Sequence, residues 1–124
     1  MDRSVTIEIC NTPYELYLST AAVMEISRKY GGLEKFGETL EASGDAAFAL
    51  SEVVSLVTLL ANQAILRDNI LNGTDKKLLT EEAVQVLTSP GDLAEFRNAI
   101  GEAISKGMQR NIKSEDDEKN ATTG

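Results

Sequence analysis

Residues 45–73, DAAFALSEVVSLVTLLANQAILRDNILNG, are predicted to form one long helix that is apolar around most of its circumference. At about 100° per residue, the polar side chains between positions 51 and 63 fall within an arc of about 140°. The residues of this polar arc are Ser51, Glu52, Ser55, Thr58, Asn62 and Gln63. A helix on a protein surface usually carries an apolar stripe only a little wider than about 100°. We therefore expect either the central helix of a small bundle or a docking surface for another chain.

Leu59 lies in the middle of the polar arc, where packing within the chain does not obviously require a leucine. A single exposed leucine is ordinary, so this position alone carries little weight. The candidate partner-binding residues on the long helix are Leu56, Leu59, Leu60 and Gln63. Leu56 and Leu60 suit a core more readily. We accordingly expect Leu59 to tolerate a charged substitution and Leu60 to lose its fold when charged.

A strictly alternating pattern near the N-terminus predicts a β-hairpin over residues 4–18. Its apolar positions are Val5, Ile7, Ile9, Tyr14, Leu16 and Leu18. Residues 11–13, Asn-Thr-Pro, are expected to supply the turn. An isolated hairpin is marginal in water, so the helices that follow must cover its apolar face.

Local start and stop signals predict further helices on both sides of the long one. Ser19 or Thr20 caps a helix that ends at Gly31-Gly32, and a short helix follows over residues 33–43. Thr80 caps another short helix, and Ser89-Pro90 opens the last one, which ends near residue 112. The predicted fold is α+β, mainly α. A hairpin and a bundle of four to five helices form one domain over residues 1–112, and the polar tail 113–124 is expected to be disordered.

The composition offers little for catalysis or metal binding. The 124 residues contain no histidine and one cysteine, so histidine catalysis and a zinc site of the usual ligands are both excluded. Cys10 is expected to be incidental. The acidic pair Glu81-Glu82 suits the start of a helix, where negative charge is favourable. We expect no catalytic residues, no metal, no cofactor and no enzyme activity.

The net charge of −8 and the scattered lysines and arginines argue against some partners. A nucleic-acid binder needs a basic surface, and an anionic membrane repels an acidic chain, so neither partner is expected. Polar residues interrupt the long apolar segment every few positions, and we expect no transmembrane span. Residues 1–5 do not look like a secretory signal, which favours the cytoplasm.

The order of elements resembles the tail assembly chaperones of long-tailed bacteriophages and prophages. Three phrases carry the resemblance: residues 14–20, YELYLST; residues 21–31, AAVMEISRKYG; and the closing pair, residues 79–87, LTEEAVQVL, and 93–108, LAEFRNAIGEAISKGM. The resemblance spans roughly residues 5–112. It contains no invariant chemical motif.

This resemblance implies a non-catalytic protein of the host bacterial cytoplasm. Such a protein binds the apolar tape measure protein, and in some cases the tail tube protein, and keeps the tape measure soluble until the tube polymerises around it. The resemblance supplies no fixed client-binding motif, so the candidate residues above rest on helix geometry alone. The alternative interpretation is a small helical adaptor, or a homo-oligomeric structural protein that buries the long helix in a self-interface. A carboxylate-only enzyme is a more remote third possibility.

Overall fold

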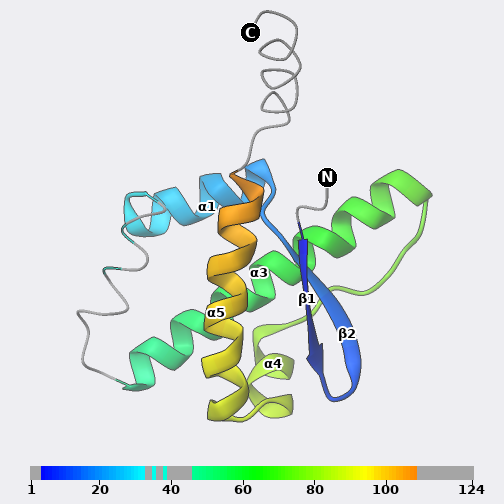
Figure 1. Cartoon of the computed structure of the whole chain (residues 1–124). Helices are drawn as coiled ribbons and strands as arrows, with labels where there is room; N and C mark the ends of the chain where they lie inside the picture. Colours follow the sequence, from blue (N-terminus) through cyan, green and yellow to red (C-terminus); the bar gives the residue numbers. More distant parts are fainter. Residues whose placement is uncertain (1–3, 33–34, 36–37, 39–45, 109–124) are drawn as a thin grey trace, which may run out of the picture.

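The structure is a computed structural model, and it describes residues 4–32, 35, 38 and 46–108. Its elements are β1 (Ser4–Ile9), β2 (Thr12–Tyr17), α1 (Thr20–Tyr30), α3 (Ala46–Asn72), α4 (Glu81–Leu87) and α5 (Pro90–Gly107) (Figure 1). The predicted α+β, mainly α fold with an N-terminal hairpin is confirmed. The short helix predicted at 33–43, apart from residues 35 and 38, and the predicted disordered tail lie outside the described residues.

The hairpin turns at Cys10 and Asn11, whose φ angles are 50° and 66°. A two-residue hairpin loop with positive φ at both positions matches the right-handed twist of the strands, and asparagine adopts this conformation readily. The predicted turn at residues 11–13 is therefore wrong, and Pro13 belongs to β2, where it pairs with Glu8. The alternation itself is confirmed, because the core-facing residues Ile7, Ile9, Leu16 and Leu18 are all buried.

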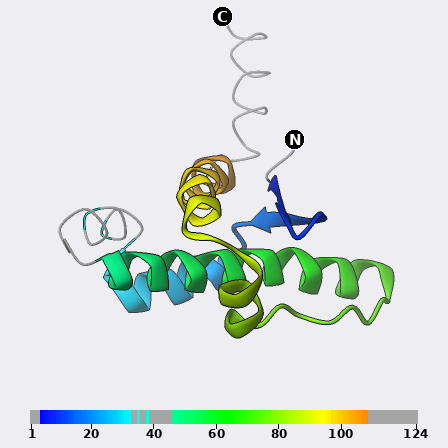
Figure 2. The same ribbon diagram turned by 90° about the horizontal axis from the view of Figure 1, so that it is seen from below.

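Helix α3 is one unbroken helix of 27 residues, and every other element packs on it or on the hairpin. Seen from below, the hairpin and α5 lie on the same side of α3 (Figure 2). In the first view, α1 and α4 lie on opposite sides of α3 (Figure 1). The long helix is therefore the central helix of the bundle over its middle turns.

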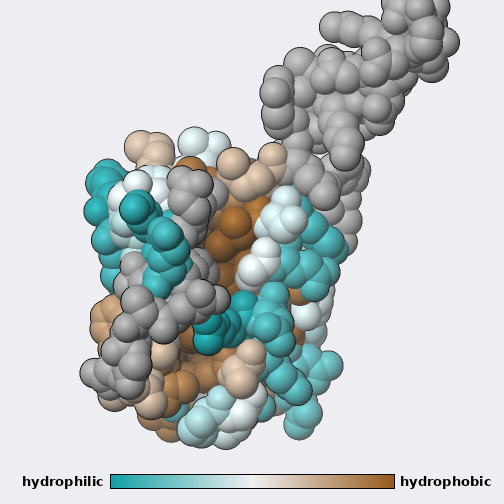
Figure 3. Space-filling model, turned by 60° about the vertical axis from the view of Figure 1, so that its left-hand side comes forward, coloured by the Kyte–Doolittle hydropathy of each residue, from teal (hydrophilic) through white to brown (hydrophobic). Residues whose placement is uncertain are grey.

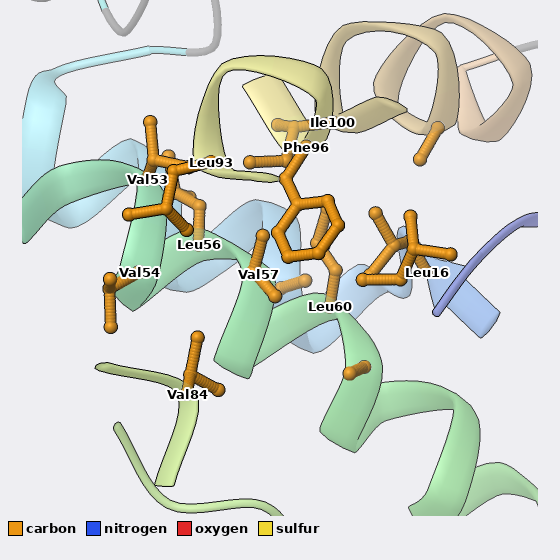
Figure 4. Packing of buried hydrophobic residues seen from close by; sticks show 14 of the residues in the cluster. Leu16, Val53, Val54, Leu56, Val57, Leu60, Val84, Leu93, Phe96 and Ile100 are labelled. Carbon is orange, nitrogen blue, oxygen red and sulfur yellow. The ribbon is translucent and has the colours of Figure 1, made fainter. Parts of the chain in front are cut away.

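The core contains fully buried side chains from five elements. They are Leu16 on β2, Ile26 on α1, Val57 and Leu60 on α3, Val84 on α4 and Ile100 on α5. Figure 4 shows the Phe96 ring over Val57 and Leu60, with Leu16 beside Leu60 and Val84 on the opposite side from Phe96. Burying one such aliphatic side chain contributes about 1.5–3 kcal/mol, so these contacts hold the elements on α3.

By length and composition alone, α3 would be able to cross a membrane. Its middle turns, however, are buried among the hairpin, α4 and α5. The core helix of a folded domain meets the same test, and this packing accounts for the apolar composition of the middle turns of α3.

Helix α1 packs on the polar arc of α3 between Glu52 and Gln63. Ser19, the N-cap of α1, donates a hydrogen bond to Gln63, and Tyr30, the last residue of α1, donates one to Glu52. Ser19 and Tyr30 are eleven residues apart in the sequence, and so are Glu52 and Gln63. Eleven residues are about three helical turns. The two antiparallel helices are thus joined at both ends in one register.

Glu52 is only 7% exposed, so its charge needs partners. The Lys29 ammonium lies 3.1 Å from its carboxylate, and the Tyr30 hydroxyl donates to the same oxygen. Burial, and then the neighbouring Glu52 carboxylate, raise the pKa of Tyr30 above its ordinary value of 10.0. Tyr30 therefore keeps its proton in the folded chain at pH values where the unfolded chain has lost it.

The stability of the domain should consequently fall as the pH rises above 10.0, because the unfolded state then binds fewer protons than the folded state. Tyr30→Phe should lower the free energy of unfolding at neutral pH by about 1 kcal/mol. It should also make the decline above pH 10.0 shallower. Urea unfolding across this pH range would measure both effects. Tyr14→Phe on β2 is the control, and a decline equally steep in Tyr30→Phe and in the unaltered chain would contradict the assignment.

Gly107, at the end of α5, lies against the hairpin where no side chain fits. A Cβ atom at this position would lie 2.5 Å from the Leu18 Cβ, whereas a Cβ at Gly101 of the same helix would meet nothing within 4 Å. Gly107→Ala should therefore lower the free energy of unfolding by about 1–3 kcal/mol through overpacking. Gly101→Ala should raise it by up to about 1 kcal/mol, because alanine favours the helix. Chemical denaturation of the two variants would test this, and similar effects would refute it.

Candidate functional site

The predicted partner-binding residues lie at different depths in the structure. Leu56 and Leu60 are 3% and 0% exposed, so neither can contact a partner while the domain stays folded. Leu59 is partly buried and packs against the core, and Gln63 is partly buried beside Ser19. Leu59 is therefore less free than the sequence analysis expects, and a charge there should also disturb the packing of α1.

The face that carries Leu59 and Gln63 nevertheless continues beyond α1. Leu59, Gln63, Leu66 and Ile70 are spaced by four, three and four residues, which places them on one side of a helix. Helix α1 begins beside Gln63, and beyond it Leu66 is 38% and Ile70 80% exposed. The exposed apolar residues on this face of α3 therefore lie beyond Leu59 and Gln63, towards the end of the helix.

Leu71, which is 67% exposed, adds to this surface around the helix. We call Leu66, Ile70 and Leu71 the terminal apolar surface. Figure 2 shows this end of α3 extending past the hairpin, with only the connection to α4 running beneath it. The surface exists because α3 is longer than the elements that pack on it.

The sequence indicates the terminal apolar surface through the difference in predicted length between the long helix and the helix before it. The 27 residues of α3 span roughly 40 Å, whereas the 11 residues of α1 span roughly 16 Å. A helix of the second length cannot cover one of the first. Comparing the predicted lengths would therefore have pointed to an uncovered end, although not to which end.

Two asparagines of α3 fasten the connection between α3 and α4. The Asn62 amide donates to the Leu79 carbonyl at 2.9 Å and accepts from the Leu79 N–H at 2.7 Å. Asn69, seven residues later on the same face, accepts from the Lys76 N–H at 3.0 Å and donates to the Lys76 carbonyl at 3.2 Å. The connection is thus held along one side of α3, and the last turns of the helix have partners although little packs on them.

An ion pair stabilises the same end. The Lys76 ammonium binds the Asp68 carboxylate, and the Asn72 amide also donates to Asp68. These hydrogen bonds, that of Lys76 first, lower the pKa of the Asp68 carboxyl. The pair is exposed to solvent and mainly limits the conformations of the connection.

An open groove of about 690 Å³ separates the end of α3 from β2. Tyr14 and Glu15 line one wall, and Ile65, Arg67 and Leu71 line the other. The terminal apolar surface borders this groove through Leu71. The Arg67 guanidinium lies 5.1 Å from the centre of the Tyr17 ring and so covers part of the hairpin.

Other apolar side chains are exposed without forming a comparable helical stripe. Leu78, Val86 and Leu87 lie on the connection and on α4, and Met24 lies on α1. On the face at the left of Figure 1, apolar residues form a strip bordered by hydrophilic ones (Figure 3).

The described residues contain no group of three or more histidine, cysteine, aspartate or glutamate side chains placed to hold a metal. The Cys10 thiol is exposed in the hairpin turn, 3.5 Å from the Leu87 carbonyl oxygen.

Asn62→Ala should release the connection from α3 by removing both bonds to Leu79. The free energy of unfolding should fall by about 1–3 kcal/mol, because a partly buried main-chain N–H and carbonyl then lack partners. Asn98→Ala on the exposed face of α5 should leave it unchanged or slightly raised, since alanine favours the helix. Urea denaturation would measure both. An Asn62→Ala variant as stable as Asn98→Ala would show that the two hydrogen bonds between Asn62 and Leu79 do not stabilise the fold.

Comparison with known protein families, with curated proteins and with solved structures finds no match for this chain. The resemblance to tail assembly chaperones therefore rests only on the phrases given in the sequence analysis.

Proposed function

We propose that this chain is a tail assembly chaperone of a long-tailed phage or prophage. In this role it binds the tape measure protein in the host cytoplasm, keeps it soluble and is displaced as the tail tube polymerises. It acts by binding and carries out no reaction. The observation that carries the proposal is the terminal apolar surface, which offers an apolar client a place to bind without opening the core.

The geometry of this surface suits a helical client. Leu66 and Ile70 lie one turn apart and form part of a ridge along α3. A second apolar helix can pack against such a ridge through its own residues at three- and four-residue spacing. Leu71 would extend the contact towards the groove beside β2.

The strength of this contact also suits a chaperone. Fully burying one leucine or isoleucine contributes about 1.5–3 kcal/mol. Association of two molecules costs an estimated 4–15 kcal/mol or more, so three side chains give only weak binding at one site. Several copies could each cover a separate apolar segment of one long client, and each could still leave when tube subunits arrive.

The charge of the chain supports the same role. A net charge of −8 opposes non-specific association between copies and keeps a complex with an apolar client soluble. The terminal apolar surface is small and carries few charges, so this repulsion does not prevent a specific contact there.

A second candidate function uses the same surface. An adaptor or a homo-oligomeric structural protein would bury Leu66 and Ile70 against a second copy of α3. The exposure of these residues is the observation that favours it. Light scattering would distinguish the two, because a stable dimer or ring that masks this surface is expected only of the second.

Ile70→Glu should weaken client binding tenfold or more, since the loss of one buried aliphatic contact is about 1.5–3 kcal/mol. The measurement is the soluble yield of a tape measure fragment that aggregates when expressed alone, co-expressed with each variant. Thermal stability should stay near that of the unaltered chain, because Ile70 is 80% exposed. Leu60→Glu, at a position with 0% exposure, should instead unfold the domain.

Val86→Glu is the matched control, because Val86 is 75% exposed on α4, away from this surface. It should preserve the soluble yield. A fragment that aggregates equally with and without the unaltered chain would reject the chaperone function. Equal losses for Ile70→Glu and Val86→Glu would reject the assigned surface alone.

A further inference from the structure

Strand β1 has one edge without a strand partner among the described residues, since the sheet contains only β1 and β2. Pro13 lies opposite Glu8, and proline cannot donate a hydrogen bond across a strand pair. Glu8 is therefore at a non-hydrogen-bonded position, and so is Thr6, two residues earlier. Their main-chain N–H and carbonyl groups point away from β2, towards the open edge.

This edge borders a groove of about 750 Å³ between β1 and α5. We call it the edge groove. Residues 5–8 line it from the strand, and Phe96 and Ala99 contribute from α5. Phe96 is buried and Ala99 partly buried, so apolar side chains lie beneath a main-chain edge that still has hydrogen-bonding capacity.

The charges of the edge groove are of one sign. Its acidic lining residues are Glu8, Asp92, Glu95 and Glu102, and within residues 4–32, 35, 38 and 46–108 no lysine or arginine lines it. On α5 the three acidic positions are separated by three and seven residues, which places them along one side of the helix. Glu102 also pairs with the half-buried Lys106 at 3.5 Å, and the Asp92 carboxylate accepts a hydrogen bond from the Ser89 N–H, so Glu8 and Glu95 carry the negative charge that faces the groove.

We propose that the edge groove binds an extended, cationic segment of a partner protein, which adds as a third strand beside β1. The main-chain groups of Thr6 and Glu8 would supply the hydrogen bonds, and lysine or arginine at alternate positions would face the carboxylates of α5. This interaction lies outside the proposed function, because it uses neither the terminal apolar surface nor an apolar helix.

Charge decides between this partner and a second copy of the chain. A second copy carries a net charge of −8 and would bring its own Glu8 to the same edge. Like charges across a strand pair are unfavourable, so Glu8 selects against self-pairing while it attracts a cationic strand.

A labelled synthetic peptide of alternating lysine and valine tests the proposal by fluorescence anisotropy with the full chain at low salt. We expect saturable binding that weakens as salt is added, and no binding of a glutamate-valine peptide. Thr6→Pro should weaken binding at least tenfold, because it removes an outward N–H while the pairing with β2 is unaffected. Thr6→Val keeps that N–H and should bind like the unaltered chain.

The double variant Glu95→Gln and Glu102→Gln should weaken binding several-fold and reduce its salt dependence. Glu25→Gln with Glu82→Gln makes the same change of charge on α1 and α4 and should have no such effect. Should Thr6→Pro not fold, hydrogen exchange of the unaltered chain gives the answer, since the peptide should protect the Thr6 and Glu8 amides. Absence of binding, equal binding by Thr6→Pro and Thr6→Val, or protection confined to other amides would overturn the proposal.

Discussion

The structure depends on a mismatch of length between α3 and the elements that pack on it. The hairpin, α4 and α5 together bury one stretch of α3, and the fully buried Val57 and Leu60 lie within that stretch. Helix α1 covers the polar arc only from Glu52 to Gln63, because its own eleven residues are no longer than that. The turns beyond Gln63 are bonded to the connection through Asn69 and carry apolar side chains into solvent. Stability and exposure thus come from different parts of the same helix.

Much of this fold follows from periodicity. Strict alternation predicted the faces of the hairpin, and the caps at Ser19, Thr80 and Ser89 were each found where a short polar side chain precedes a helical pattern. The turn at Cys10 and Asn11 was missed because Pro13 gave a stronger local signal, although proline is acceptable in a strand at a non-hydrogen-bonded position. A cysteine with positive φ has no comparable signal in the sequence.

The candidate site was harder to predict than the fold. A helical wheel shows which way each side chain of a helix points, but it does not show which turns of the helix a neighbouring element covers. Leu59 and Ile70 share one face of α3, yet α1 lies beside the first and ends before the second. The wheel also separates polar from apolar residues and so treats Glu52 and Gln63 as exposed. In the structure they are partners of Tyr30 and Ser19, at the same eleven-residue spacing on the facing helix. The pairing of these residues becomes visible only when the spacing of polar residues on α1 is compared with that on α3.

The two surfaces differ in what they require of a partner. The terminal apolar surface would bind through the hydrophobic effect, which has no directional requirement, so it suits many apolar sequences. The edge groove adds main-chain hydrogen bonds and carboxylates at fixed spacing, which suits an extended cationic segment. The hairpin separates them, because β2 faces the end of α3 whereas β1 faces α5. The two proposals therefore place an apolar client and a basic segment on different sides of the hairpin, and Thr6 lines both grooves.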